Sequence, residues 1–131
     1  MEKIYYTIEE ANLKIKYVEE CVIKLMSLER AIRLLDSIEI QPRENNIEDE
    51  MMDVEFSLKY HRLNTEFYTL LGELLTKGIL VRDLELGVVD FLSRHKDEEV
   101  YLCWEQGEKE IKYWHYAQDP FNSRRPISLL K

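Results

Sequence analysis

The residues whose types could carry chemistry gather in the last third of this chain. Asp90 interrupts the apolar run 88–92, and His115 ends an aromatic segment. A carboxylate within an apolar strand costs free energy unless it is paired, and a buried carboxyl of raised pKa suits proton transfer. We therefore predict Asp90 and His115 as a catalytic acid–base pair or as metal ligands. The alternative is structural: Asp90 pairs with Arg94 or a tail arginine, and a half-buried His115 bonds to a carbonyl group.

Two glutamates would extend this pair into a metal site. A divalent metal is the candidate cofactor, and its predicted ligands are Asp90, Glu105, Glu108 and His115. The chain has no Cys-x-x-Cys or His-Glu-x-x-His motif, and its four glycines do not cluster. A standard zinc site and a glycine-rich phosphate loop are therefore not expected.

Arg124 and Arg125 in the tail are a candidate anion-binding pair, because the forked guanidinium group suits carboxylate and phosphate. Tyr101 and Trp114 complete the predicted ligand-binding set. The alternative is that the two arginines attach an irregular tail to the acidic body of the protein.

A first long helix is expected near the start of the chain. Thr7 followed by Glu10 forms a capping box, in which each side chain bonds to the other residue's main-chain amide. Apolar residues then recur every three or four positions as far as Leu35, which places them on one helix face. Pro42 cannot continue a helix, so the pattern ends before it.

A second helical pattern begins at Ile47 or Glu48 and ends at Gly78, where glycine suits a left-handed terminal turn. Residues 7–77 are thus predicted as an antiparallel hairpin of two helices of about 30 residues each. The apolar stripe of the second helix comprises Phe56, Tyr60, Leu63, Phe67, Leu70 and Leu74.

Residues 78–131 are predicted as a small antiparallel sheet of about three strands with an irregular tail. Segments 79–81 and 88–92 are apolar and β-branched, with a turn between them and a charged loop at 93–98. Segments 100–104 and 111–115 alternate like a β-hairpin around Gly107-Glu108.

This turn fixes the predicted hairpin pairing: Trp104 faces Ile111, Leu102 faces Tyr113, and Val100 faces His115. The pairing puts His115 at the end of the apolar face that packs on the helices. The mixed face, open to solvent or a partner, carries Tyr101, Cys103, Glu105, Glu110, Lys112 and Trp114. A register slip of one residue would exchange the two sets.

Length and composition set further limits. At 131 residues the chain is expected to form one domain, 1–131. A net charge of −8 argues against nucleic acid and against an anionic membrane surface as partners. No apolar run reaches the roughly 20 residues of a membrane span, and no apolar leader opens the chain, so a cytoplasmic location is expected. The two cysteines give no framework for a disulfide.

Several segments resemble the family of domain of unknown function 2203 (DUF2203). They are YTIEEAN at 6–12, GILVRD at 78–83, GVVDF at 87–91, VYLCW at 100–104, GE at 107–108, YWH at 113–115, Phe121 and RRPI at 124–127. Leu92 and Lys109 stand where members often carry proline. The resemblance covers essentially the whole chain and implies a small cytoplasmic protein without an assigned activity. It adds weight to Asp90, Trp104, Glu108, Trp114, His115 and the tail arginines.

The predicted fold is α+β: a long antiparallel helical hairpin followed by a small antiparallel sheet with a C-terminal β-hairpin. Two amphipathic helices leave apolar surface uncovered, and a homodimer completing a four-helix bundle would bury it. The leading hypothesis is therefore a homodimeric assembly or interaction module whose protein partner is not identified. The alternative is a metal-dependent or acid–base enzyme, or a protein that binds a small anion through Asp90, His115 and the tail arginines. A third hypothesis is recognition of a basic protein by the acidic surface.

Overall fold

The computed structural model describes residues 2–38, 46–119 and 123–130. Two helices come first, followed by five strands and a short 3-10 helix. Their bounds are α1 Ile8–Asp36, α2 Ile47–Thr76, β1 Ile79–Asp83, β2 Val88–His95, β3 Glu98–Glu105, β4 Tyr113–Tyr116, β5 Arg125–Pro126 and η2 Ile127–Leu129. The α+β prediction is thus confirmed, although the sheet has five strands rather than about three. The predicted link around Pro42 lies outside the described residues.

The capping box predicted for α1 is present. The Thr7 hydroxyl accepts a hydrogen bond from the Glu10 amide (3.1 Å), and the Glu10 carboxylate accepts one from the Thr7 amide (3.0 Å). These bonds satisfy two donors that the start of a helix leaves unpaired. The helix therefore begins at the residue that the sequence indicates.

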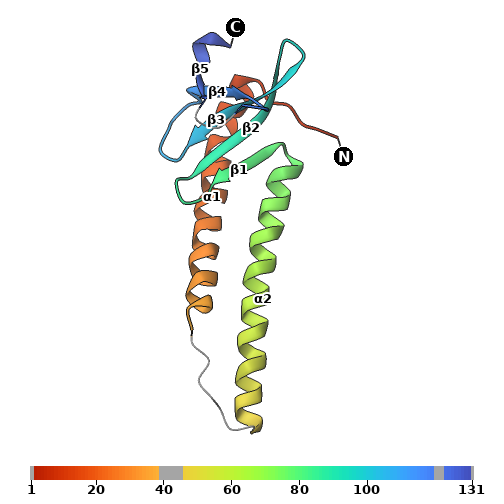
Figure 1. Ribbon diagram of the computed structural model, residues 1–131, viewed down its shortest axis with the longest axis vertical. Coiled ribbons are helices and arrows are strands. Elements are labelled where there is room, and N and C mark those ends of the chain that lie inside the picture. Colours follow the sequence, from red (N-terminus) through yellow and green to blue (C-terminus); the bar gives the residue numbers. More distant parts are fainter. Residues whose placement is uncertain (1, 39–45, 120–122, 131) are drawn as a thin grey trace.

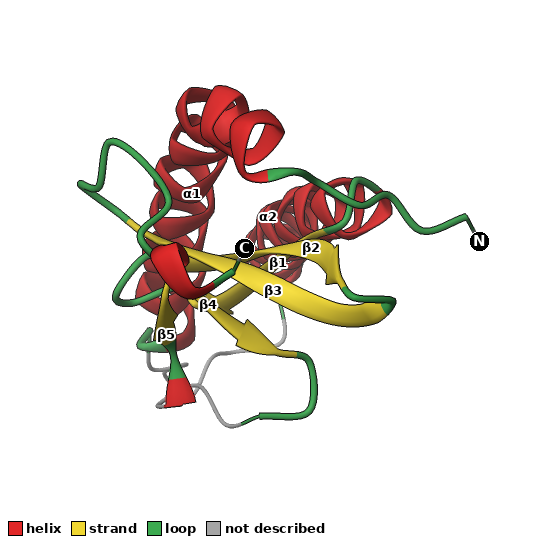
Figure 2. Ribbon diagram, turned by 90° about the horizontal axis from the view of Figure 1, so that it is seen from above, coloured by secondary structure: helices red, strands yellow, loops and turns green. Residues whose placement is uncertain are grey.

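Helix α1 lies along one face of the sheet, and together with α2 it projects well beyond the sheet (Figures 1 and 2). The buried core joins Ala11, Ile15, Val18 and Val22 of α1 to Val89, Phe91, Val100, Leu102, Trp104 and Trp114 of the sheet. Helix α2 contributes only Leu74 to the fully buried set. No helix in the described part of the chain is long and apolar enough to cross a membrane.

The strands form an antiparallel meander in the order β1-β2-β3-β4-β5. The expected charged loop at 93–98 is instead a tight hairpin, because β2 continues to His95 and β3 begins at Glu98. Lys96 and Asp97 form its turn with φ values of 52° and 66°. Positive φ at both central residues matches the twist of the flanking strands.

The predicted pairing of β3 with β4 is wrong by one residue. The structure pairs Tyr101 with His115 and Leu102 with Trp114. The reason is that the connection between β3 and β4 is wider than a two-residue turn. Within it, the Trp104 indole donates a hydrogen bond to the Glu108 carbonyl (2.9 Å). The Ile111 amide donates one to Asn12 Oδ1 of α1 (2.7 Å). The slip sends Trp114 to the helix side and His115 to the opposite face.

The tail also differs from the prediction of an irregular segment, since β5 pairs with β4. At the other end of the chain, the N-terminal arm joins the sheet next to the α2–β1 junction. The Tyr6 amide donates to the Leu92 carbonyl (2.8 Å), and the Leu92 amide donates to the Gly78 carbonyl (2.9 Å). Tyr6 before α1 and strand β5 after β4 are therefore both hydrogen-bonded to the sheet.

Candidate functional site

A buried polar cluster lies on the face of the sheet that points away from the helices. Asp90 on β2 is opposite Cys103 on β3, and His115 on β4 is opposite Tyr101. Because side chains alternate along a strand, these four residues share the outer face while Val89, Phe91 and Leu102 face the helices. Three neighbouring strands thus bring together the predicted pair Asp90 and His115.

Asp90 is at the centre of the cluster and has no exposed surface. Its Oδ2 accepts a hydrogen bond from Arg82 Nε (2.6 Å) and lies 3.1 Å from His115 Nε2. Its Oδ1 accepts a bond from Cys103 Sγ (2.9 Å). The salt-bridge partner of Asp90 is therefore Arg82, and not Arg94 or a tail arginine as the structural alternative supposed.

His115 faces an oxygen acceptor at each ring nitrogen. Its Nδ1 lies 2.9 Å from the Tyr116 carbonyl oxygen, and its Nε2 faces the Asp90 carboxylate. A carbonyl and an ionised carboxylate only accept, so this arrangement favours the doubly protonated imidazolium form of the ring. The hydrogen bond to Asp90 raises the pKa of His115 above its ordinary value, against the opposing effect of burial.

Burial alone would raise the pKa of Asp90. The hydrogen bonds from His115, Cys103 and Arg82 outweigh burial, so the pKa of Asp90 lies below its ordinary value. The sequence suggested a carboxyl of raised pKa as the proton-transfer alternative; the structure contradicts it, because three donors converge on Asp90. The cluster holds a carboxylate between two cations.

Cys103 is a thiol in this arrangement. Burial, together with the charge of Asp90, raises its pKa far above the ordinary value. A catalytic cysteine is activated by a base that takes its proton, whereas here the thiol donates to Asp90 and Asp90 lies between thiol and imidazole. The geometry does not favour a nucleophilic cysteine.

Arg82 reaches Asp90 from β1. Leu80 pairs with Asp90, and Arg82, two residues further along the strand, lies on the same outer face of the sheet. The register shifts at Arg82, since Val81 pairs with Val89 and Asp83 with Val88. Its guanidinium also lies 4.9 Å from the ring of Tyr101, so these two side chains cover the cluster.

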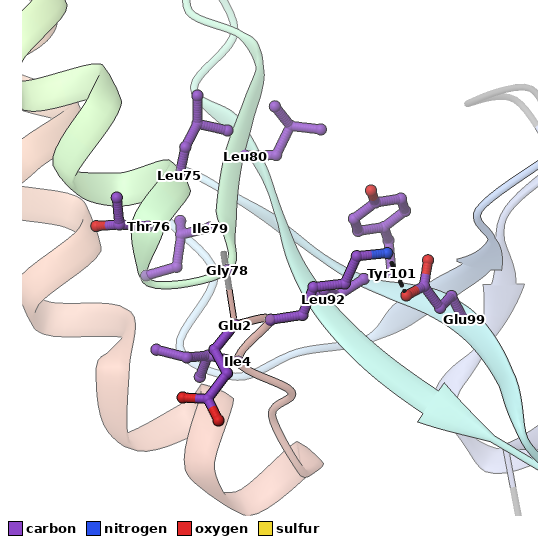
Figure 3. A pocket seen from close by; sticks show the side chains of 11 residues that line it. Glu2, Ile4, Leu75, Thr76, Gly78, Ile79, Leu80, Leu92, Glu99 and Tyr101 are labelled. Atoms are coloured by element: carbon purple, nitrogen blue, oxygen red, sulfur yellow. Dashed lines mark hydrogen bonds and ion pairs between the residues drawn. The ribbon is translucent and has the colours of Figure 1, made fainter.

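Tyr101 also borders a pocket of about 160 Å³ beside the N-terminal arm (Figure 3). The ring centroid of Tyr101 lies 5.5 Å from that of His115. Leu80 and Leu92 give the pocket an apolar wall, and Glu99 gives it a carboxylate that accepts hydrogen bonds from Lys3 (2.8 Å) and Tyr5 (2.7 Å). Of the predicted site residues, Tyr101 therefore connects the cluster with a cavity.

The other predicted ligand-binding residues lie elsewhere. Trp114 packs in the core, and its indole donates to the Pro126 carbonyl (3.1 Å). Arg125 forms an ion pair with Asp119 (3.2 Å) and lies over the Trp114 ring (5.3 Å), which is the tail-attaching role set out as the alternative. Arg124 lies over Tyr113 (5.0 Å).

The two predicted glutamate ligands do not join Asp90 and His115. Glu108 Oε1 accepts a hydrogen bond from the amide of Glu105, the last residue of β3 (2.8 Å), so both residues belong to the turn where β3 ends. Within the described residues, the close group of possible metal ligands is Asp90, Cys103 and His115, whose ligand atoms all lie within 4.8 Å of one another. Cys103 and Arg82 are the members of the cluster that sequence reasoning missed.

The fold and cluster define an α+β protein in which a helical hairpin packs on one face of a five-stranded meander and buried ionic groups occupy the other. The chain belongs to the DUF2203 family, described as an uncharacterized conserved protein, whose family model matches residues 4–127. The resemblance noted in the sequence is therefore confirmed. Neither a curated protein nor a solved structure matches the chain.

Proposed function

We propose that this protein is a homodimeric assembly module in which two helical hairpins associate through the outer side of α2. The observation that carries the proposal is a second apolar stripe on this helix. Its residues are Ile47, Met51, Val54 and Leu58, each between 58% and 71% exposed. An exposed apolar stripe of this kind marks an interaction surface.

The second stripe lies opposite the first. At about 100° per residue, Ile47 and Leu58 fall on the helix face opposite Phe56 and Tyr60. The face with Tyr60 is used within the chain, since Tyr60 bonds to Asp36 of α1. Helix α2 therefore presents one apolar face to α1 and another to solvent.

A second copy of the chain fits this stripe because the intervals between the four stripe residues read the same from either end. The intervals are four, three and four residues, so an antiparallel contact places Ile47 against the partner subunit's Leu58 and Met51 against the partner subunit's Val54. A self-complementary patch is what a two-fold dimer interface requires. Because the stripe lies opposite the face that packs on α1, the contact would set the four helices side by side with the two α2 helices in the middle, and would not close the four-helix bundle expected from the sequence.

The test is the oligomeric state, measured by size-exclusion chromatography with light scattering at micromolar concentration. We expect a dimer for the wild-type chain and a monomer for the double variant Val54→Glu, Leu58→Glu, because charge at the interface cannot be buried unpaired. The control is Leu13→Glu, at an apolar position of α1 that is 85% exposed and should leave the dimer intact. A monomeric wild type, or a dimer that survives the double substitution, would overturn the proposal.

The cytoplasm is the proposed location. Both cysteines, Cys21 and Cys103, are free thiols, as is usual in a reducing compartment.

We also propose an alternative function, binding of a small anion or acid–base chemistry at the outer face of the sheet. The imidazolium of His115 and the partly exposed Arg82 favour it, because they place positive charge beside the pocket that Tyr101 borders. The test adds acetate or propionate and follows the ring signals of His115 and Tyr101 by NMR. Saturable shifts that disappear in Arg82→Gln would support this function, and unchanged signals would reject it.

A further inference from the structure

Three unlike donor groups meet in the outer-face cluster: a carboxylate, a thiol and an imidazole. Asp90 Oδ1 and Cys103 Sγ are 2.9 Å apart, and Asp90 Oδ2 and His115 Nε2 are 3.1 Å apart. Ligands bound to zinc at about 2.0 Å through N or O and about 2.3 Å through S are roughly 3.2–3.6 Å from one another. The third pair, Cys103 Sγ and His115 Nε2, lies within 4.8 Å, so side-chain adjustments that bring all three separations into this range would admit a cation.

The groups behind these donors hold them in the orientation that a metal requires. His115 Nδ1 is fixed by the Tyr116 carbonyl, which directs Nε2 at the Asp90 carboxylate. Arg82 holds Asp90 Oδ2. Histidine ligands of metals typically donate their other ring N–H to a carbonyl or carboxylate, and carboxylate ligands are likewise hydrogen-bonded from behind.

The backbone adds rigidity. The three donors come from the adjacent strands β2, β3 and β4, and their residues are 0%, 1% and 2% exposed. Sites on paired strands keep their geometry better than sites on loops. Thiolate with imidazole selects zinc and similar cations over magnesium and calcium, which prefer oxygen ligands alone.

We propose that Asp90, Cys103 and His115 form a three-ligand site for a divalent cation of the zinc class, with its fourth position open to water or a ligand. On binding, bonds form from the cation to a carboxylate oxygen, to Sγ and to Nε2. Cys103 loses its thiol proton and His115 loses its Nε2 proton. The cation brings two positive charges, and the two released protons carry two away. The net charge of the site beside Arg82 therefore does not change.

The site coincides with that of the alternative function and is independent of the dimer. The test below measures metal binding and not anion binding or turnover, so its outcome is distinguishable from failure of either function.

The probe is Co²⁺ added to the full chain after treatment with a chelator. A thiolate bound to Co²⁺ gives a charge-transfer absorption in the near ultraviolet, and a four-coordinate site gives intense visible bands. We expect both signals in the wild type and in Cys21→Ser, their loss in Cys103→Ser, and their displacement by Zn²⁺. Cys21 is the matched control, because it is the other buried free cysteine and lies in α1.

A second measurement uses only the wild-type chain, because Cys103→Ser could fail to fold. Zn²⁺ should slow alkylation of Cys103 at least tenfold while Cys21 reacts at an unchanged rate, as read by peptide mass spectrometry. The absence of a thiolate–Co²⁺ band in the wild type, a band that survives in folded Cys103→Ser, or equal protection of both cysteines would overturn the proposal.

Discussion

Asp90 is a buried charge whose cost is offset by its three partners. Removing one member of a buried ion pair leaves the others without compensation. We expect Asp90→Asn to lower the free energy of unfolding by about 3 kcal/mol, because Arg82 and His115 lose their charged partner. Urea denaturation of the chelator-treated protein measures this change.

The control for Asp90→Asn is Asp119→Asn, which breaks the ion pair with Arg125 at a partly exposed position. Such pairs contribute about 0–1 kcal/mol. Equal losses from both substitutions would contradict the central role given to Asp90.

The pair of Asp90 and His115 also predicts how stability depends on pH. The pKa of His115 is raised above 6.5 in the folded chain, so its stabilising effect is complete below that pH and is lost as pH rises through the folded-state pKa. The pKa of Asp90 is lowered below 3.8, so its stabilising effect is present above that pH and is lost on acidification.

We therefore expect the free energy of unfolding of the chelator-treated protein to fall as the pH rises above about 6.5. The fall should be smaller in His115→Gln, which has no imidazole to titrate. Denaturation midpoints at several pH values test this, and parallel curves for the two proteins would refute it.

At this scale the sequence was sufficient to select Asp90 and His115, because a carboxylate in an apolar strand needs a partner. It was not sufficient to find Arg82, because the predicted strand 79–81 ended before this residue, whereas β1 continues to Asp83. Cys103 was overlooked because segment 93–98 was taken for a loop. A two-residue turn at Lys96-Asp97 places Asp90 opposite Cys103, but lysine at positive φ is an uncommon turn residue.

Among the elements, the junction between α2 and β1 depends on a glycine. Gly78 has a φ of +75°, and a Cβ there would collide with the main-chain oxygen of Ile4. We expect Gly78→Ala to destabilise the protein by at least about 1–2 kcal/mol, from backbone strain and from displacement of the N-terminal arm. Thermal unfolding measures the effect.

Gly72 provides the matched substitution, because it lies inside α2 and a Cβ there would meet nothing within 4 Å. Gly72→Ala should stabilise the chain by up to about 1 kcal/mol through helix propensity. A tolerated Gly78→Ala would show that the arm does not pack as described.

The helices were more predictable than the sheet. Capping and periodicity are local signals, and α1 and α2 begin where those signals indicate. The pairing of β3 with β4 depends on the loop between them, whose shape is set by contacts with Glu108 and with Asn12 of α1. That information is not local, and the error of one residue exchanged the two faces.

For the whole molecule, the proposed dimer has an acidic rim. In the antiparallel contact, Glu48 of one subunit comes close to the partner subunit's Glu55 on the same flank of the stripe, and like charges repel. Raising the ionic strength from about 0.01 M to about 0.15 M shortens the screening length from about 30 Å to about 8 Å. The dimer should therefore tighten with salt, as analytical ultracentrifugation can measure.

The double variant Glu48→Gln, Glu55→Gln should dimerise more tightly and depend less on salt. Dissociation of the wild-type dimer by salt would contradict the antiparallel contact. It would favour instead the pairing of acidic with basic surfaces.

The sequence by itself determined the two helices, the antiparallel sheet and the choice of Asp90 and His115, because caps, periodicity and a misplaced charge are properties of neighbouring residues. Only the tertiary structure decided that Asp90, Cys103, His115 and Arg82 meet, and on which face. Strand register and a loop held by α1 bring them together, and both depend on packing between segments far apart in the chain.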